Sequence, residues 1–480
     1  MNFKNTGTIQ QVKDGVVFAE GLSDVGYNET VLIKTNEGAV KGLALNLDED
    51  LVGIVVLGNY LKVKEGDLVE THGTLLSINV DERILGKTVD ALGNLYNSSE
   101  PACPNGKPMP LEKLAPGVLD RTNVSVPLQT GILAIDATIP IGRGQRELII
   151  GDRQTGKSAI CVDTIINQKG KDVYCIYVSV GQKNAKLAQT ISQLEKAEAL
   201  KYTTVVCANA ADPASMQYIA TYAGCAIGEY FAQQGKNALV IYDDLTKHAW
   251  AYRELSLLLR RPPGREAYPG DIFYIHSKLL ERALQFNKEL GGGTLTALPI
   301  VETQAGDLSA YIPTNIISIT DGQIFLDKDT FNMGQRPAVD IGASVSRVGG
   351  DAQVRTMKQV AGKLKLELAQ YRELKAFSQF GSDLDEETKK KLDRGARLME
   401  TLKQDQSEPL SLEDQVLLIL SITEGVLDQQ EVAKTKEVTE RLLSTLKESR
   451  ETVILAVTEK RKLTEQEINK IKKEMEGIVH

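Results

Sequence analysis

The sequence predicts three domains: a small N-terminal antiparallel β-barrel over residues 1–68, a central α/β domain with a mostly parallel sheet over 69–354, and a C-terminal α-helical domain over 355–480. Three observations predict this order. Short β-rich runs with glycine-containing turns come first, apolar strands alternating with helix-length segments follow, and the remainder has helical spacing. A chain of 480 residues is too long for one hydrophobic core, which agrees with several domains.

The N-terminal segment is expected to form a barrel because its strands are short and closely spaced. GVVFAE, ETVLIKT and LVGIVVLG are separated by turns such as Asp14-Gly15. Closely spaced strands of this kind are typical of small antiparallel barrels. An oligonucleotide-binding barrel would have the same spacing, but this segment has few aromatic and many acidic residues.

The central segment is expected to contain a parallel sheet. After a loop-rich stretch with five prolines between residues 94 and 117, apolar runs such as DVYCIYVSV, YTTVVCA and ALVIYD alternate with helix-length segments. Continuous apolar strands alternating with helices indicate a parallel sheet that is covered on both faces.

Beyond about residue 354 the pattern is helical. Ser411 with Asp414, and Thr464 with Glu467, predict capping boxes that open two helices. The charged C-terminal end is interpreted as a solvated helical face, with a nucleic-acid-binding arm as the alternative.

The composition disfavours several classes of protein. No apolar run reaches the roughly 18 residues that a membrane-spanning helix needs, and the N-terminus lacks a signal pattern, so membrane association is expected through a partner. The net charge of −8 disfavours a nucleic-acid partner. The five cysteines lack metal-ligand spacing and are expected to be buried, reduced thiols.

The strongest chemical signal is a G-x-x-x-x-G-K-S motif between an expected strand, Glu147–Ile150, and an expected helix. Such a P-loop holds phosphates with its backbone N–H groups and the helix N-terminus. Lys157 is expected to reach the outer phosphates, and the Ser158 hydroxyl to ligate Mg²⁺. The motif comprises Gly151, Asp152, Arg153, Gln154, Thr155, Gly156, Lys157 and Ser158.

Two strand ends add to this site. Asp243 ends the run ALVIYD and is preferred to Asp244 as the acid that holds Mg²⁺ through water, although such a residue is more often a helix cap or a turn residue. Gln182 follows YCIYVSV, where ATPases of this sheet type commonly have a carboxylate that polarises the attacking water. An amide cannot accept that proton but can orient water, so Gln182 alone does not decide activity.

The segment RPAVDIGASVSRVGG places Arg347 after a serine-rich turn. Such an arginine is either a surface charge or, in a ring of P-loop subunits, a residue that stabilises charge on a neighbour's γ-phosphoryl group. Composition and spacing leave both interpretations open.

Nearly the whole chain resembles the alpha subunits of F-type ATP synthases. GDRQTGKSAI, YVSVGQK, LLRRPPGREAYPGD, PIVETQAGD, ISITDGQIFL and RPAVDIGASVSRVGG occur in the order of that family, and AFSQFGSDLD and LKQDQSEP continue the match. The resemblance implies a RecA-like central domain and a ring of three such chains alternating with three beta subunits around a gamma shaft. The beta subunits would hold the catalytic sites for ATP synthesis or hydrolysis coupled to ion transport, while this chain would bind Mg²⁺ with ATP or ADP without turnover.

The resemblance also assigns residues. Arg347 matches the arginine that enters the beta catalytic site, and Ser344 matches a supporting position that the family needs for activity. Gln182 agrees with a non-catalytic subunit because the beta subunit has glutamate there. The loop around Ser382–Glu387 is expected near the shaft. Beside the P-loop, Gln182 and Asp243, the implied nucleotide-site residues are Glu302, the adenine-side residues Phe331, Arg336 and Pro337, and, from the helical domain, Gln404 and Gln406.

Alpha subunits usually begin with a helical extension that docks the peripheral stalk, whereas this sequence leads from Met1 directly into the first strand. A delta subunit and stalk are therefore expected partners with a weakened attachment. The expected location is the cytoplasmic face of a bacterial plasma membrane, or its organellar equivalent, through the membrane sector. The alternatives are a paralogous F-like rotary ATPase without normal stalk coupling, a catalytic protein-export ATPase, and a hexameric RNA translocase, which would need a glutamate in place of Gln182.

Overall fold

The computed structural model describes residues 5–378 and 385–479, and the chain forms two compact units. Each unit combines segments that are distant in the sequence. Unit 1 comprises Met1–Thr122, Gly170–Glu302 and Leu308–Thr320, and unit 2 comprises Asn123–Lys169, Thr303–Asp307 and Asp321–His480.

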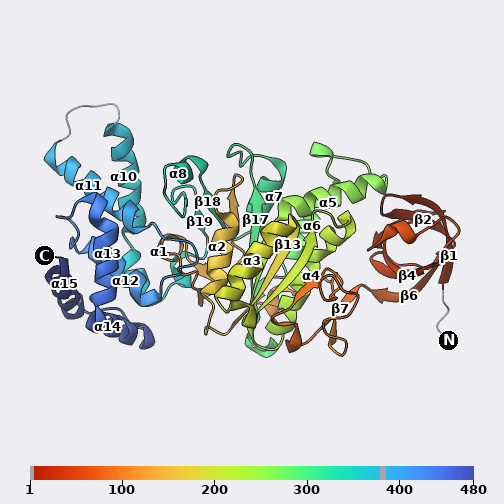
Figure 1. Ribbon diagram of the computed structural model, residues 1–480, viewed down its shortest axis with the longest axis horizontal. Coiled ribbons are helices and arrows are strands. Elements are labelled where there is room, and N and C mark those ends of the chain that lie inside the picture. Colours follow the sequence, from red (N-terminus) through yellow and green to blue (C-terminus); the bar gives the residue numbers. More distant parts are fainter. Residues whose placement is uncertain (1–4, 379–384, 480) are drawn as a thin grey trace. The chain divides into compact units, whose positions relative to one another are not determined.

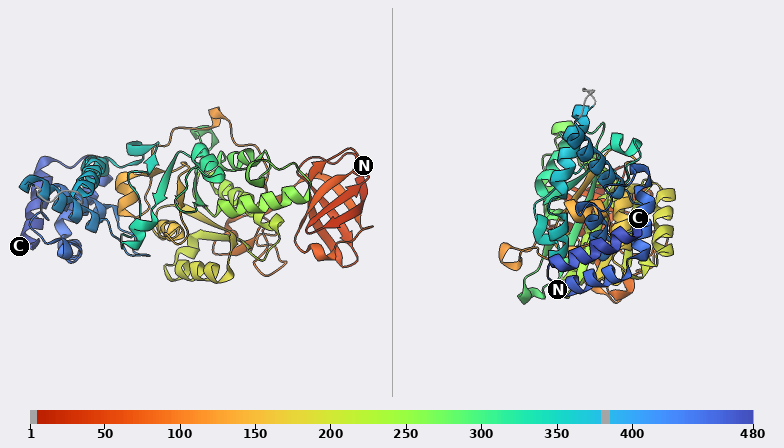
Figure 2. Two further views of the ribbon diagram at one scale, coloured as in Figure 1. Left: turned by 90° about the horizontal axis from the view of Figure 1, so that it is seen from above. Right: turned by 90° about the vertical axis from the view of Figure 1, so that its left-hand side faces the viewer.

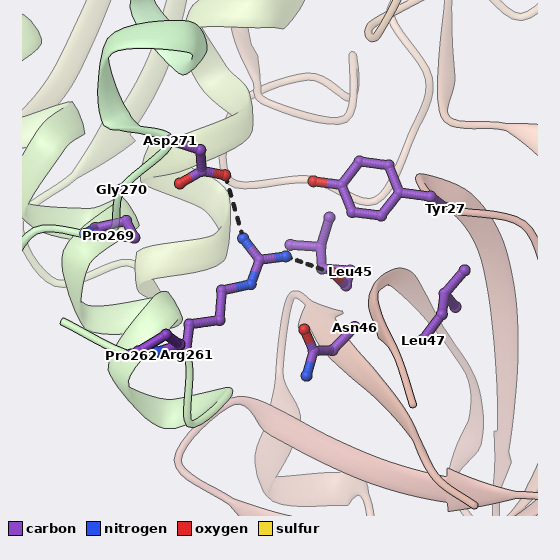
Figure 3. Close-up of a pocket in the computed structure, with 9 residues that line it drawn as sticks. All are labelled: Tyr27, Leu45, Asn46, Leu47, Arg261, Pro262, Pro269, Gly270 and Asp271. Atoms are coloured by element: carbon purple, nitrogen blue, oxygen red, sulfur yellow. Dashed lines mark hydrogen bonds and ion pairs between the residues drawn. The ribbon is translucent and has the colours of Figure 1, made fainter. Parts of the chain in front are cut away.

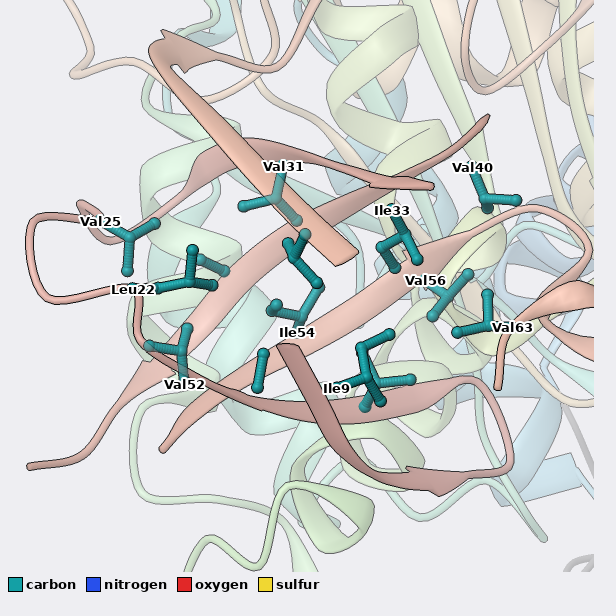
Figure 4. Close-up of a cluster of buried hydrophobic side chains, with 14 residues drawn as sticks. Ile9, Leu22, Val25, Val31, Ile33, Val40, Val52, Ile54, Val56 and Val63 are labelled. Atoms are coloured by element: carbon teal, nitrogen blue, oxygen red, sulfur yellow. The ribbon is translucent and has the colours of Figure 1, made fainter. Parts of the chain in front are cut away.

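Unit 1 begins with a closed antiparallel barrel, in the strand order β1-β2-β5-β4-β3-β6 with β6 pairing back to β1 (red in Figures 1 and 2). Its interior is filled by aliphatic side chains such as Val31, Ile33 and Ile54 (Figure 4). The strands are β1 (Asn5–Lys13), β2 (Val16–Glu20), β3 (Glu29–Thr35), β4 (Gly38–Leu47), β5 (Val52–Leu57) and β6 (Leu68–Leu75).

The barrel boundary expected at residue 68 is wrong, because the closing strand β6 begins there and continues to Leu75. The sequence LVETHGTL does not have the apolar pattern that would predict this strand. Its polar residues Glu70 and Thr71 are buried in the strand, whereas the other strands were predicted from β-rich runs between glycine-containing turns.

The second part of unit 1 is a parallel sheet in the order β17-β15-β13-β14-β8. Its strands are nearly continuous apolar runs because helices cover the sheet, as the sequence predicted. In parallel strands the carboxyl ends meet at one edge, where ligands commonly bind. The strands are β8 (Thr88–Asp90), β13 (Val173–Gln182), β14 (Thr203–Asn209), β15 (Asn237–Asp243) and β17 (Thr294–Glu302).

The remaining elements of unit 1 connect or cover these sheets. The strands are β7 (Ser77–Val80), β9 (Lys107–Pro110) and β16 (Leu284–Gln285), and the helices are α3 (Asn184–Lys196), α4 (Ala214–Ala232), α5 (Leu245–Leu258), α6 (Ile272–Leu280) and α7 (Tyr311–Ile319).

In unit 2, β12 (Leu148–Gly151) is parallel to β18 (Gly322–Leu326), and β19 (Val345–Ser346) is antiparallel to β18. Its other strands and its helices before residue 354 are β10 (Pro127–Leu128), β11 (Ile141–Gly142), α1 (Leu133–Thr138), α2 (Lys157–Ile166) and α8 (Lys328–Asn332).

From residue 355 the described chain is helical, as predicted (blue in Figure 1). The helices are α9 (Arg355–Ala361), α10 (Leu364–Ser378), α11 (Glu386–Thr401), α12 (Leu412–Thr423), α13 (Thr435–Thr445), α14 (Lys447–Thr458) and α15 (Glu465–Val479). Part of the loop expected near a shaft, Ser382–Leu384, lies outside the described residues.

The capping box predicted at Thr464 is confirmed, whereas at Ser411 the structure shows the N-cap half alone. The Asp414 N–H donates to Ser411 Oγ over 3.2 Å at the start of α12. The Glu467 N–H donates to Thr464 Oγ1 over 3.2 Å, and the Thr464 N–H donates back to the Glu467 carboxylate over 2.7 Å, before α15. All five cysteines are buried and free. Among the described helices, none is long and apolar enough to cross a bilayer.

Candidate nucleotide-binding site

The P-loop connects β12 to α2 in unit 2, with the strand ending one residue later than expected. Gln154 and Gly156 have positive φ angles of 63° and 95°. A side chain at Gly156 would meet nothing within 4 Å, so glycine is needed there for the backbone conformation. The buried Lys157 Nζ donates to the carbonyl oxygens of Gly151 over 2.8 Å and Asp152 over 2.5 Å. The P-loop therefore holds the Lys157 ammonium group against two of its own backbone carbonyl oxygens.

Asp152 fixes the loop from one side. Its carboxylate accepts hydrogen bonds from Thr303 Oγ1 over 2.7 Å and from the Gly306 N–H over 2.9 Å. Burial alone would raise the pKa of Asp152, but these hydrogen bonds outweigh burial and leave it below its usual value. The Thr303 N–H also donates to the Gly151 carbonyl over 3.1 Å. Sequence reasoning missed Thr303 and Gly306, whose one signal was their place in the matched block PIVETQAGD.

Asp243 lies at the carboxyl edge of the unit 1 sheet and is 1% exposed. Tyr177 Oη donates to Asp243 Oδ2 over 2.6 Å, and Gln182 Nε2 donates to Oδ1 over 2.7 Å. Lys186 Nζ lies 3.5 Å from Oδ2. The register of parallel strands β13 and β15 brings these residues together, so Gln182 holds the acid that the sequence assigned to the metal.

The neighbouring Asp244 has a different role. Its Oδ1 accepts a hydrogen bond of 2.8 Å from the Lys247 N–H and caps α5. Burial raises the pKa of Asp244 to about 6. Asp244 is thus a helix cap, whereas Asp243 is the last residue of β15. Glu302 ends β17 at the same edge, and its N–H donates to Thr246 Oγ1 over 2.9 Å.

The residues assigned to the adenine side lie in unit 2. The Arg336 guanidinium lies 4.6 Å from the centre of the Phe331 ring, and the Gln404 N–H donates to the Arg336 carbonyl over 2.9 Å. The Gln404 side chain accepts from the Leu133 N–H over 3.1 Å and donates to the Gly131 carbonyl over 2.8 Å. The Gln404 side chain therefore connects its loop to the backbone at residues 131–133. The Gln406 side chain is exposed. Pro337 follows Arg336 directly.

Sequence reasoning also missed Asp163, in the last turn of the P-loop helix α2. Its Oδ1 accepts a hydrogen bond of 2.9 Å from the Ser407 N–H. Burial raises the pKa of Asp163 to about 6. A carboxylate is unfavourable at the C-terminal end of a helix, so this contact ties the loop at residues 404–408 to the P-loop helix despite an electrostatic cost.

Ser344 and Arg347 lie at β19. Ser344 is fully buried; its Oγ donates to the Asp340 carbonyl over 2.6 Å and accepts from the Phe325 N–H over 2.9 Å. The Arg347 N–H donates to the Asp321 carbonyl over 2.8 Å. The Arg347 side chain is exposed, and across residues 5–378 and 385–479 no hydrogen bond or ion pair engages its guanidinium. A hydrogen bond thus holds the backbone at Arg347, while the Arg347 guanidinium is exposed.

The predicted residues are thus divided between the units. Unit 2 holds the P-loop, the adenine-side residues, Ser344 and Arg347, and unit 1 holds Gln182, Asp243 and Glu302. In the described part of the chain, no group of three or more His, Cys, Asp or Glu side chains is arranged to hold a metal ion.

A surface pocket of about 480 Å³ in unit 1 contains none of these residues (Figure 3). It lies where the barrel meets the segment after α5. Arg261 dominates it, donating to the Leu45 carbonyl and to Tyr252 Oη and pairing with Asp271 at 3.5 Å. Because these partners engage the Arg261 guanidinium, we interpret the pocket as part of the contact between the barrel and the segment after α5 within unit 1.

Known proteins are similar to this chain over nearly its whole length. The ATP synthase alpha/beta family models match as the beta-barrel domain at residues 9–73, the nucleotide-binding domain at 131–346, and the C-terminal domain at 353–478. ATP synthase subunit alpha of Petrotoga mobilis is 57% identical over 477 residues, covering 99% of this chain and 94% of that protein. The subunit of the same name from Aquifex aeolicus is 54% identical over 475 residues, with the same coverage of each. The chain therefore belongs to the ATP synthase alpha/beta family, among its alpha subunits.

Proposed function

We propose that this chain binds ATP or ADP without hydrolysing it in the head of a rotary F-type ATP synthase, and that it lends Arg347 to the catalytic site of a neighbouring beta subunit. One observation carries the non-catalytic role. Gln182 occupies the position of the beta-subunit glutamate, and its amide donates a hydrogen bond to Asp243. An amide used in this way cannot accept a proton from an attacking water.

The proposed nucleotide site follows the residues that the resemblance assigns. The P-loop N–H groups and Lys157 would bind the phosphates, and Phe331, Arg336, Pro337 and Gln406 would flank the base. Gln404 would act on the base through the loop that it holds. Glu302, Gln182 and Asp243 would contribute from the strand ends of unit 1.

Magnesium fits the donor set of this proposed site. Mg²⁺ prefers oxygen ligands and keeps several waters beside nucleotide phosphates, so it does not need a cage of protein carboxylates. The Ser158 hydroxyl would be a direct ligand. Both oxygens of Asp243 already accept hydrogen bonds, which supports a contact through water. Bound Mg²⁺ would neutralise phosphate charge.

The proposed organisation is three domains, with the barrel boundary moved from 68 to about 75 and the helical domain beginning at 355. The spans of the three matching family models support this division. In the proposed assembly the chain alternates with beta subunits around gamma, contacts delta and the peripheral stalk, and reaches the membrane through the ion-translocating sector.

The experiment is single-turnover hydrolysis by reconstituted alpha–beta rings. Arg347→Ala should slow hydrolysis by roughly 10³–10⁵-fold, the range for such arginines. Arg347→Lys should rescue little, because lysine keeps the charge and loses the planar fork of donors. The matched control is Arg355→Ala, which removes another exposed arginine at the start of α9.

Lys157→Ala should have the converse effect, with lower nucleotide occupancy on alpha and a nearly unchanged chemical step on beta. Arg347→Ala within about threefold of the parent rate, roughly 0.7 kcal/mol, would make Arg347 a surface charge and overturn the assignment. Robust turnover by the isolated chain, abolished by Lys157→Ala, would overturn the non-catalytic role.

A further inference from the structure

Helix α10 contacts the turn that precedes Arg347. Arg372, in the middle of α10, donates from Nη1 to Asp340 Oδ1 over 2.5 Å. The same carboxylate oxygen accepts the N–H groups of Gly342 over 2.9 Å and Ala343 over 3.3 Å. The Asp340 carboxylate therefore accepts hydrogen bonds from the backbone of its own turn and from the Arg372 guanidinium of α10.

Gly342 gives an independent sign of this contact. A Cβ built on Gly342 would lie 2.7 Å from Arg372 Nη1. Its φ angle lies outside the left-handed region, so other residues can adopt this backbone conformation. A side chain at residue 342 would therefore displace the Arg372 guanidinium without straining the backbone.

A second cation on α10 reaches the same turn. Lys365 Nζ donates to the Ser344 carbonyl over 3.2 Å. Lys365 and Arg372 are seven residues apart, which is two helical turns, so they project from one face of α10. That face therefore holds the turn at both of its ends, Asp340 and Ser344.

We propose that Arg372 is a positioning residue, and that α10 sets the position of residues 340–347 and thereby of the Arg347 guanidinium. This inference rests on the proposed function of Arg347. Displacement of the turn would be passed on through β19, whose Ser346 pairs with Gly322 of β18 and directly precedes Arg347. Such a displacement matters because a 1 Å misplacement of a catalytic group can cost about 10²-fold in rate.

The contact is better suited to positioning than to stability. The side chains of Arg372 and Asp340 are 40% and 28% exposed. Ion pairs as open as this contribute little to folding stability. Variants that break it are therefore expected to fold and assemble, so their kinetics can be measured.

Two variants break the contact in different ways. Arg372→Met removes the guanidinium, and Gly342→Ala displaces it while leaving every charge in place. In reconstituted rings both should lower single-turnover hydrolysis about 10–100-fold, less than Arg347→Ala does. The loss should fall on kcat with KM nearly unchanged, because Arg347 acts in the transition state. Arg372→Lys, which keeps a cation within reach of Asp340, should recover much of the rate.

The matched control is Lys375→Met, which removes another cation from α10. Lys375 lies 5.7 Å from the Tyr371 ring and is exposed. Its rate should match the parent. A double-mutant cycle adds Asp340→Asn, which keeps the oxygen that closes the turn. If both side chains act through one contact, the double variant should be no slower than Arg372→Met alone.

The outcomes separate this inference from the proposed function. Rates of Arg372→Met and Gly342→Ala within threefold of the parent, beside a slow Arg347→Ala, would overturn the positioning role and leave the function of Arg347 intact. An equal loss in Lys375→Met would also overturn it. A normal rate for Arg347→Ala would overturn both.

Discussion

The Gln182 side-chain amide donates a hydrogen bond of 2.7 Å to Asp243 Oδ1, and both side chains are buried. Tyr177 donates to the other carboxylate oxygen over 2.6 Å. Asp243 therefore accepts a hydrogen bond at each of its two carboxylate oxygens. Gln182, which the family resemblance associates with a non-catalytic subunit, is also a structural partner of the predicted metal-site acid.

Gln182→Glu should not create an ATPase. The substitution replaces the donor with a second carboxylate beside a buried one, so the two either separate or share a proton. The free energy of unfolding should fall by about 2 kcal/mol at pH 8, the order of a lost hydrogen bond to a charged group. Because the folded pair binds a proton more tightly than the unfolded chain, this loss should shrink as the pH falls to 5. Chemical denaturation and phosphate release measure the two effects.

Tyr177→Phe is the control for this change. It removes a donor to Asp243 without adding a charge, so its stability loss should vary little between pH 5 and 8. Turnover by the isolated Gln182→Glu chain above that of the parent would show that the amide alone blocks catalysis.

Lys157→Met should weaken ATP binding by about 10–100-fold, the equivalent of roughly 1.5–3 kcal/mol for hydrogen bonds to a charged group. The ammonium group lies at the loop that would hold the phosphates and is 8% exposed. Titration calorimetry with ATP measures the change. Lys363→Met removes an exposed lysine before α10 and should leave the affinity unchanged; an unchanged affinity in Lys157→Met would contradict phosphate binding by this loop.

Asp163→Asn should remove a pH dependence of stability. Burial raises the pKa of Asp163 from 3.8 to about 6, so the folded state binds the proton more tightly than the unfolded chain. Its contribution to stability is therefore lost as the pH rises from about 4 to 6, by up to roughly 3 kcal/mol. Asparagine retains an acceptor for Ser407 and does not titrate. Denaturation between pH 4 and 8 should show a flatter profile for the variant, and an identical profile would mean that Asp163 does not titrate in this range.

Local patterns predicted much of the fold and are the basis of part of the proposed site. The P-loop motif, the helix N-caps at Ser411 and Thr464, and the preference for Asp243 over Asp244 all depend on residues that are close in sequence. The barrel strand β6 was missed because its buried side chains include Glu70, which breaks the apolar signal.

The partners of the site residues could not be predicted in the same way. Asp152 and Thr303 are 151 residues apart, and Asp163 and Ser407 are 244 apart. No periodicity records such pairs, because tertiary packing alone brings them together. Gln182 and Asp243 are likewise 61 residues apart, so the sequence left the role of the Gln182 amide open.

Ser344→Ala should separate the structural from the functional role of this serine. The buried hydroxyl accepts the Phe325 N–H and donates to the Asp340 carbonyl, so alanine leaves both groups without this partner. We expect the free energy of unfolding to fall by about 1–3 kcal/mol. Ring hydrolysis should also slow, because the turn that it fixes leads into Arg347. Ser346→Ala is a comparison at the neighbouring hydroxyl, which donates to the Pro140 carbonyl over 2.7 Å and accepts the Gly349 N–H over 3.2 Å. If Ser344→Ala loses stability and hydrolyses ATP at the parent rate, the position of the turn does not control Arg347, and the serine is needed for folding alone.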